Sequence, residues 1–144
     1  LSEPLFIGFS SIICETAVGW IEMSMDDIVL RLAARRLKQH SHIKYIQKEV
    51  VKRTYGFDYE RHFLPMIEAI IGRHGIEEMN SKVDNAIVSP FVAALASLKA
   101  SRDQLAHQYI RGTTMIIDSP SVTNTRFRVV FEGLKNIEKV LLKR

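Results

Sequence analysis

The spacing of apolar residues is the feature that most limits what this chain can fold into. Apolar side chains recur every three or four residues in each large segment, and no long segment alternates with a period of two. A helix places residues three and four apart on one face, whereas a strand alternates faces. The spacing therefore predicts an all-α protein, folded as an antiparallel bundle of four to five helices.

The first helix is expected over residues 4–36. Its first half carries apolar residues on all sides, which predicts a central, buried helix, and its second half narrows to one apolar stripe. A second, basic helix is expected to follow Ser41 as its N-cap and to end near residues 54–56.

A third helix is expected around the apolar residues between 63 and 71. Proline is tolerated in a first helical turn, so Pro65 marks the start, and the helix is expected to end at Gly75. Residues 75–84 are then predicted to be a connection.

The fourth helix carries the clearest boundary signals. Ser89 is the expected N-cap, Pro90 the first helical residue, Arg111 the end and Gly112 the C′ residue. Residues 113–125 contain helix breakers and predict an exposed loop. A last amphipathic helix is expected to begin after residue 123 or 124 and to continue to the end of the chain.

Composition predicts one soluble domain over residues 1–144. The chain is 47% hydrophobic and 25% charged, with a net charge of +4. Its most apolar stretch, 5–20, is interrupted by polar residues and is too short for a membrane span. Cys14 is the only cysteine, which excludes an internal disulfide and a zinc finger. We find no secretion signal, metal motif or cofactor loop, and we expect a cytoplasmic protein.

An arginine interrupts the apolar stripe of the fourth helix. Arg102 falls where the spacing calls for a core residue, and a buried guanidinium needs a carboxylate or an anionic ligand beside it. Glu15 is the lone acid in the apolar first half of the first helix, so it is the expected partner. A structural ion pair without any chemistry is an equal alternative.

His107 follows Asp103 by one helical turn, so the carboxylate can orient the imidazole as a general base. Arg102 and His107 are five residues apart, about 140° around the helix, and therefore flank one groove without touching. A second copy of the helix would bring complementary groups together, which predicts a homodimer with a shared cleft.

Residues 101–107 read Ser-Arg-Asp-Gln-Leu-Ala-His and resemble the R-(N/D)-x-(I/L)-A-H signature of the HEPN superfamily, in its RiboL-PSP-type branch. Glu15 also matches the place where such domains carry a glutamate in a long apolar first helix. The resemblance implies a dimeric helical bundle that cleaves RNA without metal or cofactor and acts as a toxin or antiphage effector. An antitoxin or a fused regulatory domain is a further partner that such proteins can have.

The resemblance also implies roles for the residues. His107 would accept the ribose 2′-OH proton, Arg102 would stabilise the charge on the phosphorane, and Asp103 would position His107, with Glu15 in support. Tyr109 completes an R-x4-H-x-Y pattern in which the tyrosine can carry AMP, although core packing explains its position better.

Two other interpretations remain. A HEPN-like module that binds RNA or protein without cleaving it would keep the same bundle, and so would a purely structural bundle. Arginine–histidine pairs at positions 35/40 and 36/42 have similar spacing, but they straddle the expected break between two helices. The basic residues between 31 and 53 are either a solvated helix face or a phosphate-binding surface.

Overall fold

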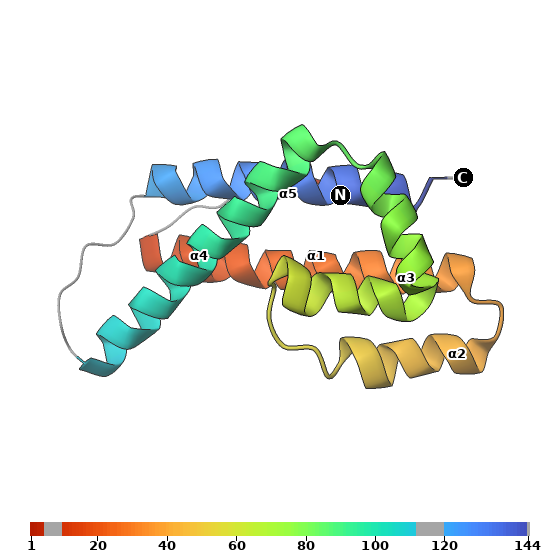
Figure 1. The fold of residues 1–144 in the computed structure, drawn as a ribbon. Coiled ribbons are helices and arrows are strands. Elements are labelled where there is room, and N and C mark those ends of the chain that lie inside the picture. Colours follow the sequence, from red (N-terminus) through yellow and green to blue (C-terminus); the bar gives the residue numbers. More distant parts are fainter. Residues whose placement is uncertain (5–9, 112–119, 144) are drawn as a thin grey trace.

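The computed structural model describes the backbone of residues 1–4, 10–111 and 120–143, and the side chains in these ranges except those of residues 10, 11, 107–111 and 120. This described part is helical and contains no strand, which confirms the all-α prediction. Its elements are, in order, α1 (Ser10–Arg36), α2 (His40–Tyr45), the π-helices η1 (Ile46–Val51) and η2 (Tyr59–Phe63), α3 (Leu64–Lys82), α4 (Asn85–Arg111) and α5 (Pro120–Leu141) (Figure 1).

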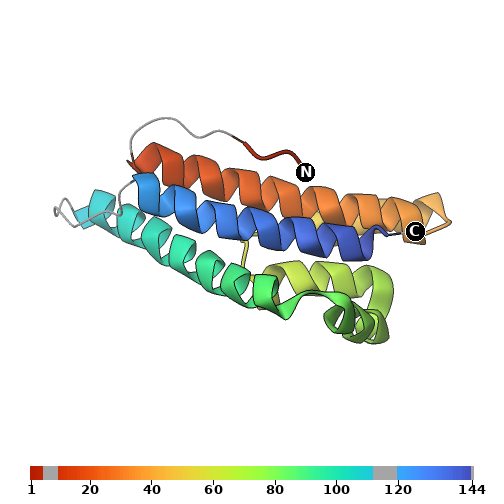
Figure 2. The same ribbon diagram turned by 90° about the horizontal axis from the view of Figure 1, so that it is seen from above.

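The helices α1 and α5 lie side by side and run in the same direction (Figures 1 and 2). Trp20 packs edge-on against Phe127 at 5.0 Å between ring centroids, and further along both helices Arg31 meets Glu138. In contrast, α4 runs antiparallel to α5 and crosses the bundle obliquely (Figure 1). The bundle therefore combines a parallel pair with antiparallel contacts.

One hydrophobic cluster joins the long helices. Its largest fully buried side chains are Ile21, Met25, Ile28, Val29, Leu32, Phe63, Met66, Ile67, Phe91, Leu98, Leu134 and Ile137. The helices α4 and α5 approach each other closely at Gly133, where a β-carbon would lie 2.3 Å from Cγ of Phe91. The absence of a side chain at this position lets the two helices pack directly on each other.

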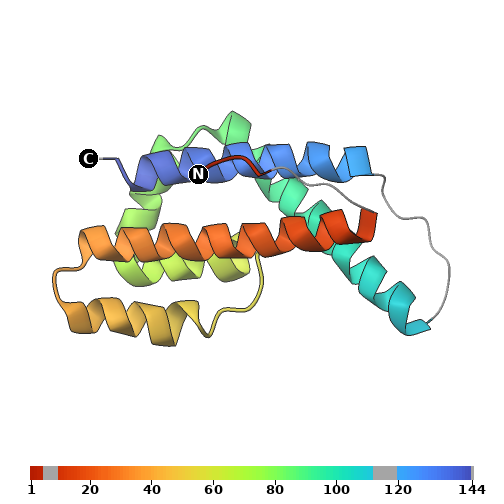
Figure 3. The same ribbon diagram turned by 180° about the vertical axis from the view of Figure 1, so that it is seen from behind.

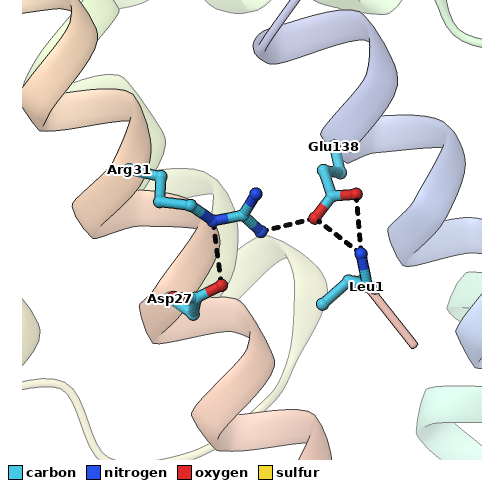
Figure 4. Close-up of polar contacts among 4 residues, drawn as sticks. All are labelled: Leu1, Asp27, Arg31 and Glu138. Carbon is cyan, nitrogen blue, oxygen red and sulfur yellow. Dashed lines mark hydrogen bonds and ion pairs between the residues drawn. The ribbon is translucent and has the colours of Figure 1, made fainter. Parts of the chain in front are cut away.

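Glu138 links α5 to α1 at one end of the bundle (Figure 4). Its carboxylate accepts hydrogen bonds from the guanidinium of Arg31 and from the amino group of Leu1, the latter at 3.2 Å. Burial raises the pKa of Glu138, but these hydrogen bonds outweigh it and hold the pKa below its usual value. Arg31 is fixed in turn by Asp27, one turn earlier, at 2.9 Å.

The first two helices differ in part from expectation. In α1, Ile13, Cys14 and Val18 are buried, but Ile12 is 52% exposed, so the first half of the helix has an open face instead of being enclosed. Residues 5–9 lie outside the described part. The second helix begins at His40, with Gln39 as its N-cap, and Ser41 lies inside it. The prediction of Ser41 as N-cap is wrong because the N-cap is Gln39, two residues earlier.

The third helix is longer than predicted. The break falls at Gly72, which adopts φ 74° and ψ 174°, and helical structure then resumes to Lys82. Glycine reaches such positive φ without steric cost, so Gly72 bends the helix, whereas Gly75 lies within it. The connection predicted over 75–84 is therefore wrong. Pro65 lies in the first turn of α3, as expected.

The fourth helix begins at Asn85, five residues before its predicted first residue, Pro90. The side chain of Asp84 accepts a hydrogen bond from the Ala86 backbone at 3.0 Å and takes the capping role assigned to Ser89. Pro90 is tolerated inside the helix because the Ala86 carbonyl, which loses its donor, belongs to an exposed residue. The helix ends at Arg111, as predicted, and Gly112 lies outside the described residues.

The last helix also begins earlier than expected, at Pro120. Thr123, predicted to cap it, lies within the helix and is 2% exposed. A proline at the first position of a helix loses no hydrogen bond, so here Pro120 opens the helix. Residues 112–119, most of the predicted loop, lie outside the described part.

Candidate active site

Arg102 lies where the apolar stripe of α4 leaves the core. Phe91, Leu95 and Leu98 are buried, whereas the Arg102 side chain, one turn beyond Leu98, is 32% exposed. The arginine therefore occupies the rim of the core, not its interior. At this position the guanidinium keeps its charge and remains accessible to a ligand from solvent.

Three neighbouring groups hold this guanidinium. Its Nη1 lies 3.7 Å from Oε1 of Glu22, its Nη2 lies 3.5 Å from Oδ1 of Asp103, and its Cζ lies 5.1 Å from the ring centroid of Phe57. Tight charge-assisted hydrogen bonds between such groups are about 2.7–2.9 Å long. The pairs at Arg102 are longer, so they orient the side chain while leaving its donors available to an anion.

The expected partner of Arg102, Glu15, is not the observed one. Glu15 is exposed, and Glu22 takes its place. Seven residues bring a helix back to nearly the same face, so the two glutamates share a face but lie about 10 Å apart along the axis. Arg102 reaches the level of Glu22. The sequence therefore predicted the correct helix and the correct face for the partner of Arg102, but a position about two turns too early.

A second carboxylate lies one turn beyond Glu22 on α1. Burial, together with the negative charge of Glu22, raises the pKa of Asp26 from its usual 3.8 to about 6. Asp26 thus exchanges a proton near neutral pH beside the carboxylate that pairs with Arg102. We did not predict either acid as a site residue, although their spacing of four residues was a usable signal.

A tight turn places Phe57 under Arg102. Gly56 adopts φ 128°, and a β-carbon there would lie 2.5 Å from the ring of His62. The Asp58 side chain caps η2, and the Asp58 backbone N–H donates to Nδ1 of His62 at 3.0 Å. The histidine thus has a structural role in the turn, which leaves Phe57 2% exposed.

A small cavity adjoins Phe57. It has a volume of about 190 Å³ and is lined in part by Tyr59, Leu95 and Lys99. Sites for whole small molecules measure roughly 300–1,000 Å³, so this cavity has room for only part of a ligand. Lys99 and Arg102 are three residues apart on α4, so a second positive charge lies near the cavity that Phe57 lines.

The remaining predicted site residues lie on the same helix. His107 and Tyr109 are in the last turns of α4, and their side chains lie outside the described residues. Asp103 is exposed, and its carboxylate pairs with Arg102, a contact we had not predicted. On the neighbouring helix, Arg126 donates a hydrogen bond to Oγ of Ser101 at 3.3 Å.

No protein-family model, curated protein or solved structure matches this chain. No single described helix has both the length and the apolar composition to cross a bilayer, although the bent pair Tyr59–Lys82 and Asn85–Ala106 reaches the required length together.

Other parts of the described chain offer less chemistry. A larger cavity, of about 350 Å³, lies between α1, α3 and α5 and is lined by Arg36, His74 and Glu78 among others, but it does not adjoin Arg102. Among the described residues, no group of three or more His, Cys, Asp or Glu side chains is placed to hold a metal ion. Cys14 is buried, as expected for an unreactive thiol.

Proposed function

We propose that the end of α4 is the active site of an endoribonuclease, with Arg102 and His107 as its catalytic residues. The observation that carries this proposal is the state of Arg102. Its guanidinium is held in place by Glu22, Asp103 and Phe57, yet its ion pairs are loose and it is partly exposed. An arginine in this state is preorganised for a phosphate, whereas a purely structural arginine would be enclosed in tight hydrogen bonds.

The reaction needs few groups. His107 accepts the proton of a ribose 2′-OH, and that oxygen attacks the adjacent phosphorus. Arg102 stabilises the negative charge that builds up on the phosphorane oxygens. The bond to the 5′-oxygen then breaks, the leaving oxygen takes up a proton, and the products carry a 2′,3′-cyclic phosphate and a 5′-OH. Asp103 lies between the two residues in sequence, pairs with Arg102 and is one helical turn before His107, which it would position.

The spacing on α4 favours a homodimer. One straight helix holds residues 102 and 107 about 140° apart and about 7.5 Å apart along the axis, so a single copy does not direct both groups at one phosphate. Two α4 helices facing each other would supply a base and a proton donor from different copies. We place this activity in the cytoplasm, as a toxin or antiphage effector whose partner is RNA and whose control falls to an antitoxin or a fused domain.

Cleavage of a labelled single-stranded RNA in the presence of EDTA tests the proposal. Loss of one donor to a developing oxyanion costs about 10²- to 10³-fold in rate, so we expect that loss in Arg102→Ala, and loss of the general base in His107→Ala costs about 10²- to 10⁴-fold. Arg73→Ala is the matched control, since Arg73 also forms a loose pair, at 3.7 Å with Glu68, on a different helix. A substrate with 2′-deoxyribose at the cleaved position must remain intact.

Equal cleavage by the wild type and by both α4 variants would place the nuclease activity in a contaminant and overturn the proposal. The alternative is a HEPN-like module that binds RNA or protein without cleaving it. This alternative keeps the contacts that join Arg102 to α1 and to Phe57, because they hold the arginine in place even without a substrate. RNA binding without cleavage, in a protein with normal folding, would decide for it.

A further inference from the structure

The net positive charge of the chain is concentrated in one segment. We define the basic arm as residues 37–56, which contain α2 and η1. The arm carries five Lys and Arg side chains against one Glu, a net charge of +4, and the whole chain also has a net charge of +4. The rest of the molecule is therefore neutral overall, and any attraction to a polyanion acts mainly through the arm.

The arm is held to the core by few side chains. In α2 no residue is buried, and in η1 only Ile46 and Val51 are. The arm lies along one edge of the molecule, beside α1 and far from α5 (Figure 3). Most of its side chains therefore face solvent instead of supporting the fold.

Its lysines form a row. Lys44, Lys48 and Lys52 are exposed and four residues apart, a step that returns a helix to within about 40° of the same direction. No ion pair among the described residues involves any of them, whereas Arg53 pairs with Glu49 at 3.0 Å. Unpaired lysines in a row match the repeating phosphates of a nucleic-acid strand.

Two exposed aromatic rings accompany the row. Tyr45 is 60% exposed and Tyr55 is 83% exposed, and both belong to the small set of large apolar residues that the described part leaves in solvent. Aromatic side chains near basic residues stack on the bases of single strands. The bases of a double helix are stacked inside it and do not reach such rings. A membrane surface fits less well, because the apolar residues Ile46 and Val51 point into the protein, not outward.

The arm leads directly to the candidate active site. Tyr55 is two residues before Phe57, whose ring lies under the Arg102 guanidinium at 5.1 Å. The turn at Gly56 and the cap at Asp58 fix the path between them. A strand bound along the lysines and stacked on Tyr55 would therefore pass towards Arg102.

We propose that the basic arm is a docking surface for single-stranded RNA that guides the strand to the end of α4. The choice of RNA over DNA rests on the proposed function, but the surface is tested without cleavage. The probe is a fluorescent 20-nucleotide RNA with 2′-O-methyl groups throughout, which cannot be cut by 2′-OH attack. Its dissociation constant is measured by anisotropy at several salt concentrations.

The test variant is Lys44→Gln/Lys48→Gln/Lys52→Gln. The matched control is Lys135→Gln/Lys139→Gln/Lys143→Gln, which removes three exposed lysines with the same sequence spacing, two on α5 and one just after it. Each phosphate contact with a single strand contributes about 0.7 to the slope of log K against log salt, so we expect the arm variant to lower that slope by about 2. Its affinity should fall by at least tenfold at low salt, and the control should stay within about threefold of the wild type.

The tyrosines are tested by Tyr45→Ala/Tyr55→Ala. Loss of base stacking at both rings should weaken binding by at least about tenfold with the salt slope unchanged, and binding of a double-stranded probe should not change. Unchanged melting temperatures establish that the variants fold. Binding that depends on the arm while RNA cleavage fails would refute the nuclease and support the docking surface. Equal binding by both lysine variants, or arm-dependent binding to anionic vesicles in place of RNA, would overturn the docking surface even if the protein cleaves RNA.

Discussion

Asp26→Asn should stabilise the protein at neutral and alkaline pH and leave its stability unchanged in acid. The pKa of Asp26 is about 6 in the folded protein and 3.8 as its usual value. The folded state holds the proton of Asp26 more tightly than the unfolded state does, so the protonated group adds fully to the free energy of unfolding below pH 3.8. This contribution decreases as the pH rises from 3.8 to about 6, and above pH 6 the free energy of unfolding no longer changes with the ionisation of Asp26. The asparagine keeps the shape of the side chain but never becomes charged.

The magnitude follows from the shift. A difference of about 2 pH units corresponds to about 3 kcal/mol at 1.36 kcal/mol per unit. Asp26 is only half-buried, and solvent screens such interactions, so we expect about 1–1.5 kcal/mol. For a domain of this size, that free energy raises the melting temperature by roughly 3–6 °C.

The assay is thermal unfolding of the variant and the wild type at a series of pH values between 3.5 and 8. The difference in melting temperature should be near zero at pH 3.5, grow through pH 4–6 and reach a plateau by pH 7. Glu132→Gln, at an exposed position on α5, is the control for loss of one negative charge. A difference that is independent of pH, or that shrinks as the pH rises, would refute the reasoning.

Three further substitutions test the packing and the site. Gly133→Ala should cost about 1–3 kcal/mol in chemical denaturation, because its β-carbon would lie 2.3 Å from the enclosed ring of Phe91; an unchanged midpoint would mean that α4 and α5 can separate freely. Gly56→Ala should cost about 1–3 kcal/mol, since it combines φ 128° with a clash against a histidine ring, and a stability equal to that of the wild type would contradict this backbone. Glu22→Gln should slow RNA cleavage at least tenfold while changing stability by less than about 1 kcal/mol, and Glu15→Gln should leave both unchanged; the opposite ranking in the cleavage assay would restore the sequence-based assignment.

The helices were predictable from sequence because their apolar spacing records which face is buried. Their ends were less predictable, because several residues compete for each signal. Ser89 and Pro90 form a good N-terminal signal, but Asp84 provides an earlier N-cap. The longer helix is also stabilised because it buries Val88. Gly72 and Gly75 are equally good helix-ending signals in the sequence, and only the packing of the chain decides which of them adopts a positive φ.

The candidate site shows the same limit. Arg102 was found because a charge interrupts an apolar stripe, a signal contained within one helix. Its partners come from elsewhere: Glu22 depends on how far α4 slides along α1, and Phe57 depends on a turn between two other helices. The apolar spacing gives the angle of a residue around the helix axis but not its position along α1 relative to α4. It therefore could not distinguish Glu22 from Glu15 as the partner of Arg102.

The parallel arrangement of α1 and α5 bears on how the chain folds during synthesis. Arg31 and Glu138 touch but are 107 residues apart in sequence, so α1 leaves the ribosome long before the helix that covers it. Until then, part of its apolar face has no partner, and the native pairing must wait for most of the chain, which slows folding relative to a bundle of sequential hairpins. Nascent chains should therefore expose α1 to chaperones, or to a second copy of itself, until α5 emerges.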